Sequence, residues 1–519
     1  METEDEADMT KERKNLGWKI VSGVILAVQF LLSAAFWGIT MWVDFLPGKY
    51  MAGIALILLI LLVLVSFFFF SGMKKKKNGS GKKWLYVKRT FGCLVSITTM
   101  GICAIGSAML FQAGNTLDNI ANSVATTDTV SAYVMKDDPA QDMTDAKDYV
   151  FAITEKYDYE HTIKAIQEID GEIGGRIHTQ TYDNVLDMVQ ALYSGAVNAM
   201  LMNEAYVDVV ESQDGYENFS AKTRTLYHHE EVKTVEPVQT PVEKDITKDP
   251  FVVYISGSDT RNLTLATSRS DVNILVVVNP ATKQVLLVNT PRDYYVDTAA
   301  CAGAKDKLTH CGIYGIDCSM ATLGNLYDEH VDYYAQINFN GFKTLVDAVG
   351  GITIESEKTF RTSEGGFYIN EGVNQLSGDM ALSYVRERKA FADGDNSRGK
   401  HQMQAIEAII KRASSGTTIL SHYSDILNSM EGMFTTSMST EEIASLVKMQ
   451  LSDLASWNVK SFAVSGKGGS TTTYSMPSKR SYVMYPDEAQ VKYAETLINK
   501  VVAGETLTDA DLLIPDEQN

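Results

Sequence analysis

The stretch NILVVVNPATKQVLLVN, residues 273–289, decides the fold class of this chain. It contains two short, β-branched and continuously apolar runs, at 273–279 and 284–289. Such runs are typical of strands that are covered on both faces. A third run of the same kind, FVVYIS, lies upstream at 251–256. These segments predict the centre of a buried sheet.

The residues that follow alternate between helical and strand patterns. Helical spacing recurs near 319–328, 342–349 and 398–412, and DYYAQINF (332–339) and GITIES (351–356) supply further strands. We therefore expect an α/β fold with a mixed central sheet sandwiched by helices, in a main domain that spans residues 251–467. Residues 468–519 are predicted to form a C-terminal extension, with a Gly/Ser/Thr-rich loop and one helix near 486–501.

Three apolar stretches occupy the first part of the chain, at 20–43, 51–70 and 91–113. Each has about 20 residues or more, which is enough for a helix to cross a bilayer. A buried core helix is the alternative, but residues 51–70 offer no polar face to water. Residues 20–113 are thus predicted to form three transmembrane helices.

Basic residues predict how these helices are oriented. The loop 73–89 holds eight Lys and Arg residues, whereas the link DFLPGKY at 44–50 holds one. Four more basic residues lie within residues 1–19. Because cytoplasmic loops are enriched in Lys and Arg, we expect the N-terminus and the loop 73–89 in the cytoplasm, and the chain after about residue 114 outside the cell.

Residues 114–227 read as a small α/β accessory domain, and residues 228–250, with many charges and three prolines, read as a linker. Cys301, Cys311 and Cys318 lie in the part predicted to be external. One pair of them could form a disulfide, but the sequence does not say which. Their spacing matches no zinc site.

Although the net charge is −19, cations gather in LSYVRERKAFADGDNSRGKHQ, residues 382–402. A solvated surface, a nucleic-acid patch and a pocket for a phosphorylated ligand are the candidates. On an extended segment, Arg386 and Arg388 would point the same way and form a fork for phosphate. Arg398 and Gln402 would share one face of a helix.

Carboxylates flank the predicted strands. Asp259 follows the run 251–256, Asp271 precedes the run 273–279 beside Arg269, and Arg292 and Asp293 follow the run 284–289. Aspartates at neighbouring strand ends can meet at one edge of a sheet, where hard oxygen ligands would suit Mg²⁺. The alternative is that Asp259 and Asp271 cap turns.

Together these motifs resemble the LytR-CpsA-Psr family of cell-envelope proteins, over roughly residues 251–415. The resemblance rests on an ordered set of motifs: GSDTR, RSDVNILVVVNP, NTPRDYYV, DKLTHCGIYG, INFNGFKTLVDAVGGI, LSGDMALSYVRER and DGDNSRGKHQ. The predicted spans and accessory domain are similar to the capsule-associated branch. Two departures are Thr290, where serine is more common, and Cys311, where alanine is more common.

The resemblance implies an enzyme that transfers a glycopolymer, capsular or teichoic-acid-like, from a polyprenyl-pyrophosphate carrier to a muramic acid hydroxyl of peptidoglycan. It further implies Mg²⁺, with Mn²⁺ as the alternative, bound by Asp259 and Asp271. The catalytic residues implied are Arg292, Arg386, Arg388 and Asp395. The implied pyrophosphate ligands are Arg269, Arg292, Lys307, Arg386, Arg388, Arg398 and Gln402. Asp395 is the expected general base, with Asp293 as the alternative.

The expected partners are therefore the lipid-linked glycopolymer, peptidoglycan and membrane lipid. A second hypothesis from the same residues is a sensor that binds polyprenyl phosphate or polysaccharide without chemistry. Binding of nucleic acid is not expected, because the arginines are predicted to lie outside the cell, the chain is acidic and no helix-turn-helix precedes the spans.

Overall fold

A computed structural model describes residues 2–71, 80–122, 124–235, 244–258, 267–301, 303–415 and 433–514. Its contacts divide the chain into two compact units. One comprises Met1–Leu117 with Glu441–Leu454, and the other comprises Asp118–Thr440 with Ala455–Asn519. Each unit is described by itself.

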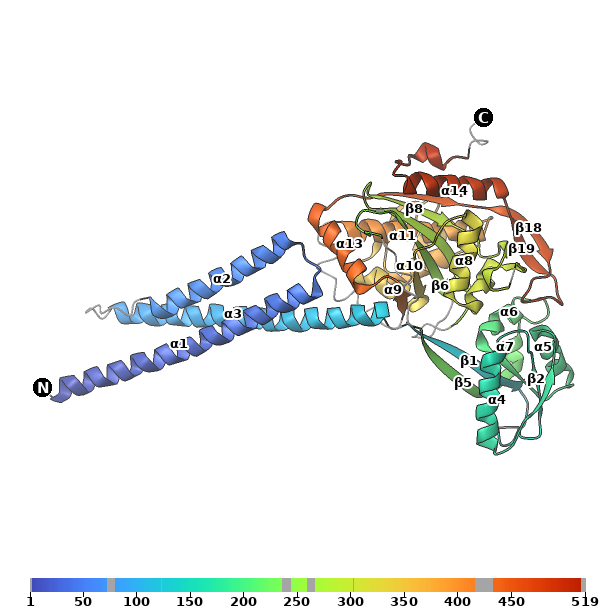
Figure 1. The fold of residues 1–519 in the computed structure, drawn as a ribbon, viewed down its shortest axis with the longest axis horizontal. Coiled ribbons are helices and arrows are strands. Elements are labelled where there is room, and N and C mark those ends of the chain that lie inside the picture. Colours follow the sequence, from blue (N-terminus) through green and yellow to red (C-terminus); the bar gives the residue numbers. More distant parts are fainter. Residues whose placement is uncertain are drawn as a thin grey trace. The chain divides into compact units, whose positions relative to one another are not determined.

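The first unit is built from three long helices, α1 (Glu2–Val43), α2 (Gly48–Phe70) and α3 (Ser80–Asn122) (Figure 1). Residues 16–43, 48–70 and 84–116 within them are helical and are long and apolar enough to cross a membrane, as the three apolar stretches of the sequence predict. Many apolar side chains of α2 point outward, among them Leu56 and Ile60. Inside the bundle, Ser96 Oγ donates a 2.8 Å hydrogen bond to Gln29 Oε1, which pairs two buried oxygen atoms of neighbouring helices.

Helix α13 (Thr440–Asp453) belongs to the same unit, although it lies far along the sequence. Lys49 Nζ donates a 2.7 Å hydrogen bond to the carbonyl of Ser452, and Lys448 lies 2.8 Å from Asp44. These contacts tie α13 to the turn between the first two apolar helices.

A six-stranded sheet forms the centre of the second unit, in the order β16-β11-β6-β7-β8-β17. Its strands are β6 (Phe251–Ser258), β7 (Ser270–Asn279), β8 (Gln284–Asn289), β11 (Tyr333–Asn338), β16 (Phe434–Thr436) and β17 (Asn458–Ala463). β6, β7 and β8 run antiparallel, whereas β11 is parallel to β6 and β17 is parallel to β8. The sheet is mixed, as predicted.

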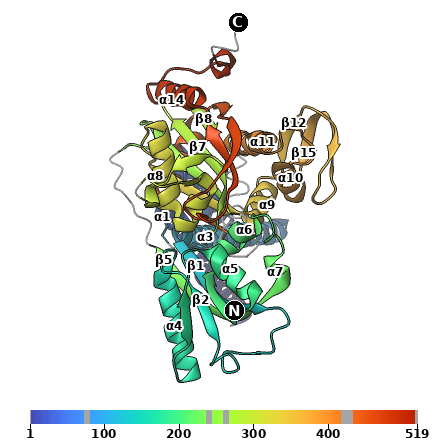
Figure 2. The ribbon, with the colours of Figure 1, turned by 90° about the vertical axis from the view of Figure 1, so that its right-hand side faces the viewer.

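Helices cover both faces of this sheet (Figure 2). α8 (Ile316–Tyr327) and α14 (Glu488–Val502) share a buried cluster with one face. α11 (Asp395–Ser414) lies on the other face against β7 and β8, and packs with α9 (Phe339–Ala348) and α10 (Gly378–Arg386). The α/β sandwich predicted from the sequence is therefore confirmed.

The remaining elements of this part are short. They are β9 (Tyr295–Asp297), η2 (Ala299–Cys301), β10 (Lys305–Lys307), η3 (Leu308–Tyr314), β12 (Ile352–Ser356), β13 (Phe360–Arg361), β14 (Tyr368–Ile369), β15 (Gly372–Leu376), β18 (Gly466–Thr471), β19 (Ser481–Pro486) and η4 (Asp509–Leu512).

The C-terminal segment differs from the expected loop-like extension. β18 and β19 form an antiparallel hairpin, in which the ring of Tyr482 lies beside Gly468 and that of Tyr485 beside Gly469. The glycines leave space for these aromatic rings, and this pairing is invisible in a Gly/Ser/Thr-rich sequence. Helix α14 completes the buried core with Leu497 and neighbouring side chains. The segment is thus integral to the sheet's core.

A second sheet, in the order β3-β2-β4-β1-β5, organises residues 124–235. Its elements are β1 (Val124–Met135), β2 (Val150–Ile153), α4 (Tyr159–Ile173), β3 (His178–Thr181), α5 (Val185–Ser194), β4 (Ala199–Asn203), η1 (Glu204–Tyr206), α6 (Val207–Glu211), α7 (Phe219–Lys222) and β5 (Thr223–Val235). Residues 228–235, expected to begin the linker, instead extend β5 along β1. β5 is an edge strand, where charged side chains are common, and its charges make it resemble a linker in sequence.

Candidate functional site

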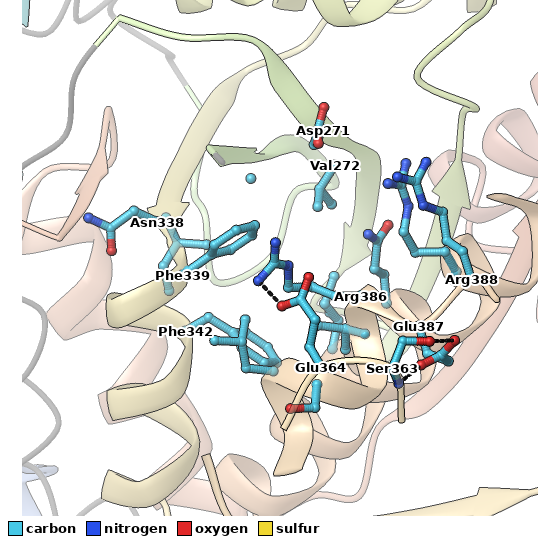
Figure 3. A pocket seen from close by; sticks show the side chains of 18 of the residues that line it. Asp271, Val272, Asn338, Phe339, Phe342, Ser363, Glu364, Arg386, Glu387 and Arg388 are labelled. Carbon is cyan, nitrogen blue, oxygen red and sulfur yellow. Dashed lines mark hydrogen bonds and ion pairs between the residues drawn. The ribbon is translucent and has the colours of Figure 1, made fainter. Parts of the chain in front are cut away.

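A cavity of about 250 Å³ opens between the central sheet and the helices α9, α10 and α11. Its apolar lining comprises Ile255, Val272, Ile337, Phe339, Phe342, Leu382, Val385 and Ile406. Its charged and amide lining comprises Asp271, Asn338, Glu364, Arg386, Glu387, Arg388, Lys389, Arg398 and Gln402. Figure 3 shows the labelled members of this set around the cavity. The site thus combines an apolar wall with several arginines.

Asp271 lies near the start of β7, where its side chain is only 11% exposed. Arg292 Nη1 lies 2.7 Å from Asp271 Oδ1, and Thr309 Oγ1 donates a 3.3 Å hydrogen bond to the same oxygen. Burial alone would raise the pKa of Asp271, but the charges of Arg292, Arg269 and Arg398 outweigh it and lower this pKa to about 2. The carboxylate is therefore ionised at neutral pH.

Arg292, Asp293 and Lys307 form a second ionic group next to Asp271. Asp293 Oδ2 lies 3.5 Å from Arg292 Nε, and Asp293 Oδ1 lies 3.1 Å from Lys307 Nζ. Burial acts to raise the pKa of Asp293, but Arg292 and Lys307 lower it below its usual value. Lys307 is therefore bound to Asp293, and it is not among the residues that line the cavity.

Arg386 and Arg388 both line the cavity. The extended segment on which the sequence analysis placed both of them is absent here. Arg386 is the last residue of α10, and the chain becomes extended only at Glu387, with φ −66° and ψ 127°. Arg386 forms an ion pair with Glu364 and places its guanidinium 4.2 Å from the centre of the Phe339 ring. Figure 3 shows Arg388 pointing away from this pair. Period-two alternation fails here because the helix ends between the two arginines.

Glu387, between these arginines, is a residue that the sequence analysis missed. It is only 2% exposed, and its carboxylate accepts hydrogen bonds from the backbone N–H and the hydroxyl of Ser363 and from the N–H of Ala390. Burial acts to raise its pKa, but these hydrogen bonds lower it. Glu387 fixes the segment that carries both arginines. A glutamate inside a charged run gives no sign of this in the sequence.

Helix α11 brings Arg398 and Gln402 to the cavity from consecutive turns, as their spacing predicts. Arg398 is only 8% exposed. The helix lies close to β8 at Gly399, where a Cβ atom would come within 2.4 Å of Asn289 Nδ2. Lys400, one residue further, is exposed. The charge run therefore divides into residues that line the cavity and residues that face solvent.

An aromatic group that the sequence analysis did not identify packs α11 against α10. The His401 ring is stacked 4.2 Å from that of Tyr384 and lies 4.8 Å from that of Phe391. Burial lowers the pKa of His401 to about 4, so the ring is neutral at physiological pH. This packing supports the turn of α11 that carries Arg398 and Gln402.

Of two further predicted site residues, the structure describes only the backbone of one and no part of the other. Asp395 is the first residue of α11, but its side chain lies outside the described residues, and so does the whole of Asp259. Ser258, which precedes Asp259, pairs with Ser270, which precedes Asp271. Within the described part of the chain, no group of three or more His, Cys, Asp or Glu side chains could hold a metal ion. Asp271 by itself suits Mg²⁺, because it is an ionised oxygen ligand.

The described cysteines in this part form no disulfide with each other. Cys311 and Cys318 are both buried and free, and the side chain of Cys301 lies outside the described residues. The two thiols hydrogen-bond to each other, and Cys311 Sγ also lies 3.6 Å from Thr322 Oγ1. The two buried thiols therefore act as core residues in this structure.

The fold and site define an α/β protein with long apolar helices and a cavity that is apolar on one side and rich in arginine on the other. The chain belongs to the LytR_cpsA_psr family, because residues 213–492, more than half of it, match that family. This confirms the resemblance drawn from the motifs.

Curated relatives support the same assignment, and solved structures are similar over about half of this chain. A Bacillus anthracis protein named polyisoprenyl-teichoic acid–peptidoglycan teichoic acid transferase TagU is 29% identical over 235 residues, which cover 45% of this chain and 76% of that protein. The protein of the same name from Enterococcus faecalis is 35% identical over 216 residues, 41% of this chain and 70% of the relative. The crystal structure of Bacillus subtilis TagV is 25% identical, with 50% of this chain and 99% of that chain covered and a TM-score of 0.42.

Proposed function

We propose that this chain is a membrane-anchored transferase that moves a glycopolymer from a polyprenyl-pyrophosphate carrier to a muramic acid hydroxyl of peptidoglycan. The observation that carries the proposal is a single cavity with two chemically different sides. Arg386, Arg388 and Arg398 supply cations for a pyrophosphate, and side chains such as Phe342 and Leu382 supply an apolar wall for a prenyl chain. The relatives named as teichoic acid transferases match this chain over 70–76% of their own length.

In the proposed reaction, the muramic acid hydroxyl attacks the phosphorus that carries the glycan. A new O–P bond forms, the bond from that phosphorus to the bridging oxygen breaks, and polyprenyl phosphate leaves with the bridging oxygen. The hydroxyl proton passes to a carboxylate. The contribution of the arginines is to position the pyrophosphate and to offset the charge that develops on the departing oxygen.

We propose Asp395 as the base that takes this proton. The alternative, Asp293, already pairs with Arg292 and Lys307, and these charges lower its pKa. A carboxylate whose pKa is lowered in this way is a weaker proton acceptor. Asp395 opens α11 one turn before Arg398, which lines the cavity, so the backbone supports its candidacy.

The proposal includes a Mg²⁺ ion, with Mn²⁺ as an alternative, held by Asp259 and Asp271. The pairing of Ser258 with Ser270 supports it, because these residues directly precede the two aspartates. A bound divalent ion would supply positive charge to phosphoryl oxygens. Arg292, which contacts Asp271, would then help to hold that carboxylate in place.

For the membrane, we propose that the N-terminus is cytoplasmic and that the cavity works outside the cell. The distribution of basic residues in the sequence supports this orientation. The lipid carrier and this chain would then share one membrane, and the prenyl tail could remain in lipid while the pyrophosphate enters the cavity.

The test is a transfer assay with the full chain in detergent, a lipid-linked oligosaccharide, peptidoglycan and Mg²⁺. We expect release of polyprenyl phosphate together with sugar covalently attached to peptidoglycan, and comparison of capsular with teichoic-acid donors identifies the polymer class. The same assay with Arg388→Ala is the inactive control, and with Lys400→Ala the active one. Saturable binding of both donors without release of polyprenyl phosphate would overturn the proposal in favour of a sensor.

A further inference from the structure

The domain formed by residues 124–235, called the accessory domain below, contacts the domain that is built around the six-stranded sheet. Tyr157 Oη donates a 2.8 Å hydrogen bond to the carbonyl of Tyr474, and Ser478 Oγ donates a 3.1 Å hydrogen bond to Asn184 Oδ1. Ile313 and Met476 are buried within the hydrophobic cluster of the accessory domain. Polar and apolar contacts together thus connect the two domains within one compact unit.

One contact of this interface involves Arg269, which is a predicted pyrophosphate ligand. Asp208, on the short helix α6, places Oδ2 3.1 Å from Nη2 of Arg269. The Arg269 side chain is 10% exposed, whereas that of Asp208 is 52% exposed. A guanidinium that is largely removed from water needs a nearby counter-charge, and here the accessory domain provides one.

Arg269 also belongs to the ionic group of the candidate site. Its charge is one of those that lower the pKa of Asp271, and Asp271 in turn contacts Arg292 at 2.7 Å. Arg292 also pairs with Asp293, and Asp293 pairs with Lys307. Negative and positive side chains therefore alternate from the accessory domain to the site, and Asp208 is the first of them.

We propose that Asp208 is a positioning residue, through which the accessory domain holds Arg269 in the orientation that binds the donor's diphosphate. This inference rests on the proposed function. The Asp208 carboxylate contacts Nη2 of Arg269, whereas Nε of Arg269 makes no hydrogen bond to any described residue. The guanidinium therefore keeps donors for a second anion. Asp208 lies outside residues 213–492, so this contact is an addition to the part of the chain that matches the family.

The experiment measures binding of geranylgeranyl diphosphate to the full chain by calorimetry, and turnover in the transfer assay. Asp208→Asn should weaken binding of this probe by about fivefold and raise the donor KM to a similar extent, with kcat less affected. Asp208→Glu, which keeps the charge, should restore most of the binding. The matched control is Asp183→Asn, which removes an equally charged, 83% exposed carboxylate from the same domain.

A double-mutant cycle then tests whether Asp208 acts through Arg269. In an Arg269→Gln background, Asp208→Asn should have almost no further effect on probe binding. Binding by Asp208→Asn equal to wild type would overturn the inference, and so would a loss that persists without Arg269. Failure of the proposed function has a different signature, because wild type would then release no polyprenyl phosphate whatever the binding measurements show.

Discussion

Arg292 and Asp271 form an ion pair that is largely withdrawn from solvent, with Nη1 and Oδ1 2.7 Å apart and side chains 15% and 11% exposed. The antiparallel register of β7 and β8 produces this contact. Ile274 pairs with Asn289, so the residues just before Ile274 and just after Asn289 lie at the same edge of the sheet. The pair keeps a carboxylate charged beside the cavity, which leads to the first two predictions.

The first prediction concerns stability at low pH. Because the pKa of Asp271 falls from 3.8 to about 2 in the folded protein, its contribution is present above the unfolded-state pKa and is lost as pH falls through the folded value. The loss should amount to on the order of 2 kcal/mol between about pH 4 and pH 2. Urea unfolding midpoints should therefore fall less steeply with acid in Asp271→Asn than in wild type. Parallel acid profiles for the two proteins would contradict this prediction.

The second prediction concerns metal. A chelator should abolish transfer, and Mg²⁺ should restore it. Asp271→Asn should require about tenfold more Mg²⁺ for half-maximal rate, since an amide is a weaker ligand for a hard cation than a carboxylate. Asp297→Asn, at an exposed position on β9, is the control and should leave the requirement unchanged. Full activity of wild type in chelator would refute the metal proposal.

The buried parts of the fold could be predicted from sequence because their signals are local. The apolar runs at 251–256, 273–279 and 284–289 each form a central strand, and the spacing of Arg398 and Gln402 correctly predicts a shared helix face. These patterns depend on burial and backbone periodicity alone.

Other features could not be predicted, because they depend on partners distant in sequence. Residues 228–235 form a strand only because β1 lies beside them. The glycine-rich strand β18 pairs with β19, whose tyrosine rings lie beside its glycines. Likewise, the directions of Arg386 and Arg388 depend on where α10 ends. The contact of Asp208 with Arg269 requires two domains to meet. Tertiary contacts outweigh local pattern in each case.

The third prediction compares two cations of the run 382–402. Arg388→Lys keeps the charge but loses the planar fork, so transfer should fall about tenfold or more if the ligand is a phosphate held at two points. Lys400→Ala removes a whole charge from an exposed position of α11 and should change the rate less than twofold. Initial rates at saturating donor separate these outcomes. Near-normal activity of Arg388→Lys would assign Arg388 to a merely solvated surface.

The fourth prediction concerns Glu387. Glu387→Gln replaces one acceptor oxygen by a donor, which then faces the N–H of either Ser363 or Ala390. Because the side chain is buried, the free energy of unfolding should drop by about 1–3 kcal/mol. Glu371→Gln, at an exposed position between β14 and β15, is the matched control. Equal denaturant midpoints for the two variants would show that Glu387 does not hold this segment.

The last prediction concerns Glu364, whose carboxylate pairs with Arg386 at the rim of the cavity. The pair is partly solvated, with Arg386 21% and Glu364 54% exposed, so it contributes little to stability. Its carboxylate nevertheless competes with any phosphate for the Arg386 guanidinium. Glu364→Gln should therefore bind geranylgeranyl diphosphate about two- to threefold more tightly than wild type. The Phe339 ring still lies against the guanidinium in this variant and keeps it in place. Weaker binding by Glu364→Gln would show the opposite role, in which Glu364 orients Arg386 for the ligand.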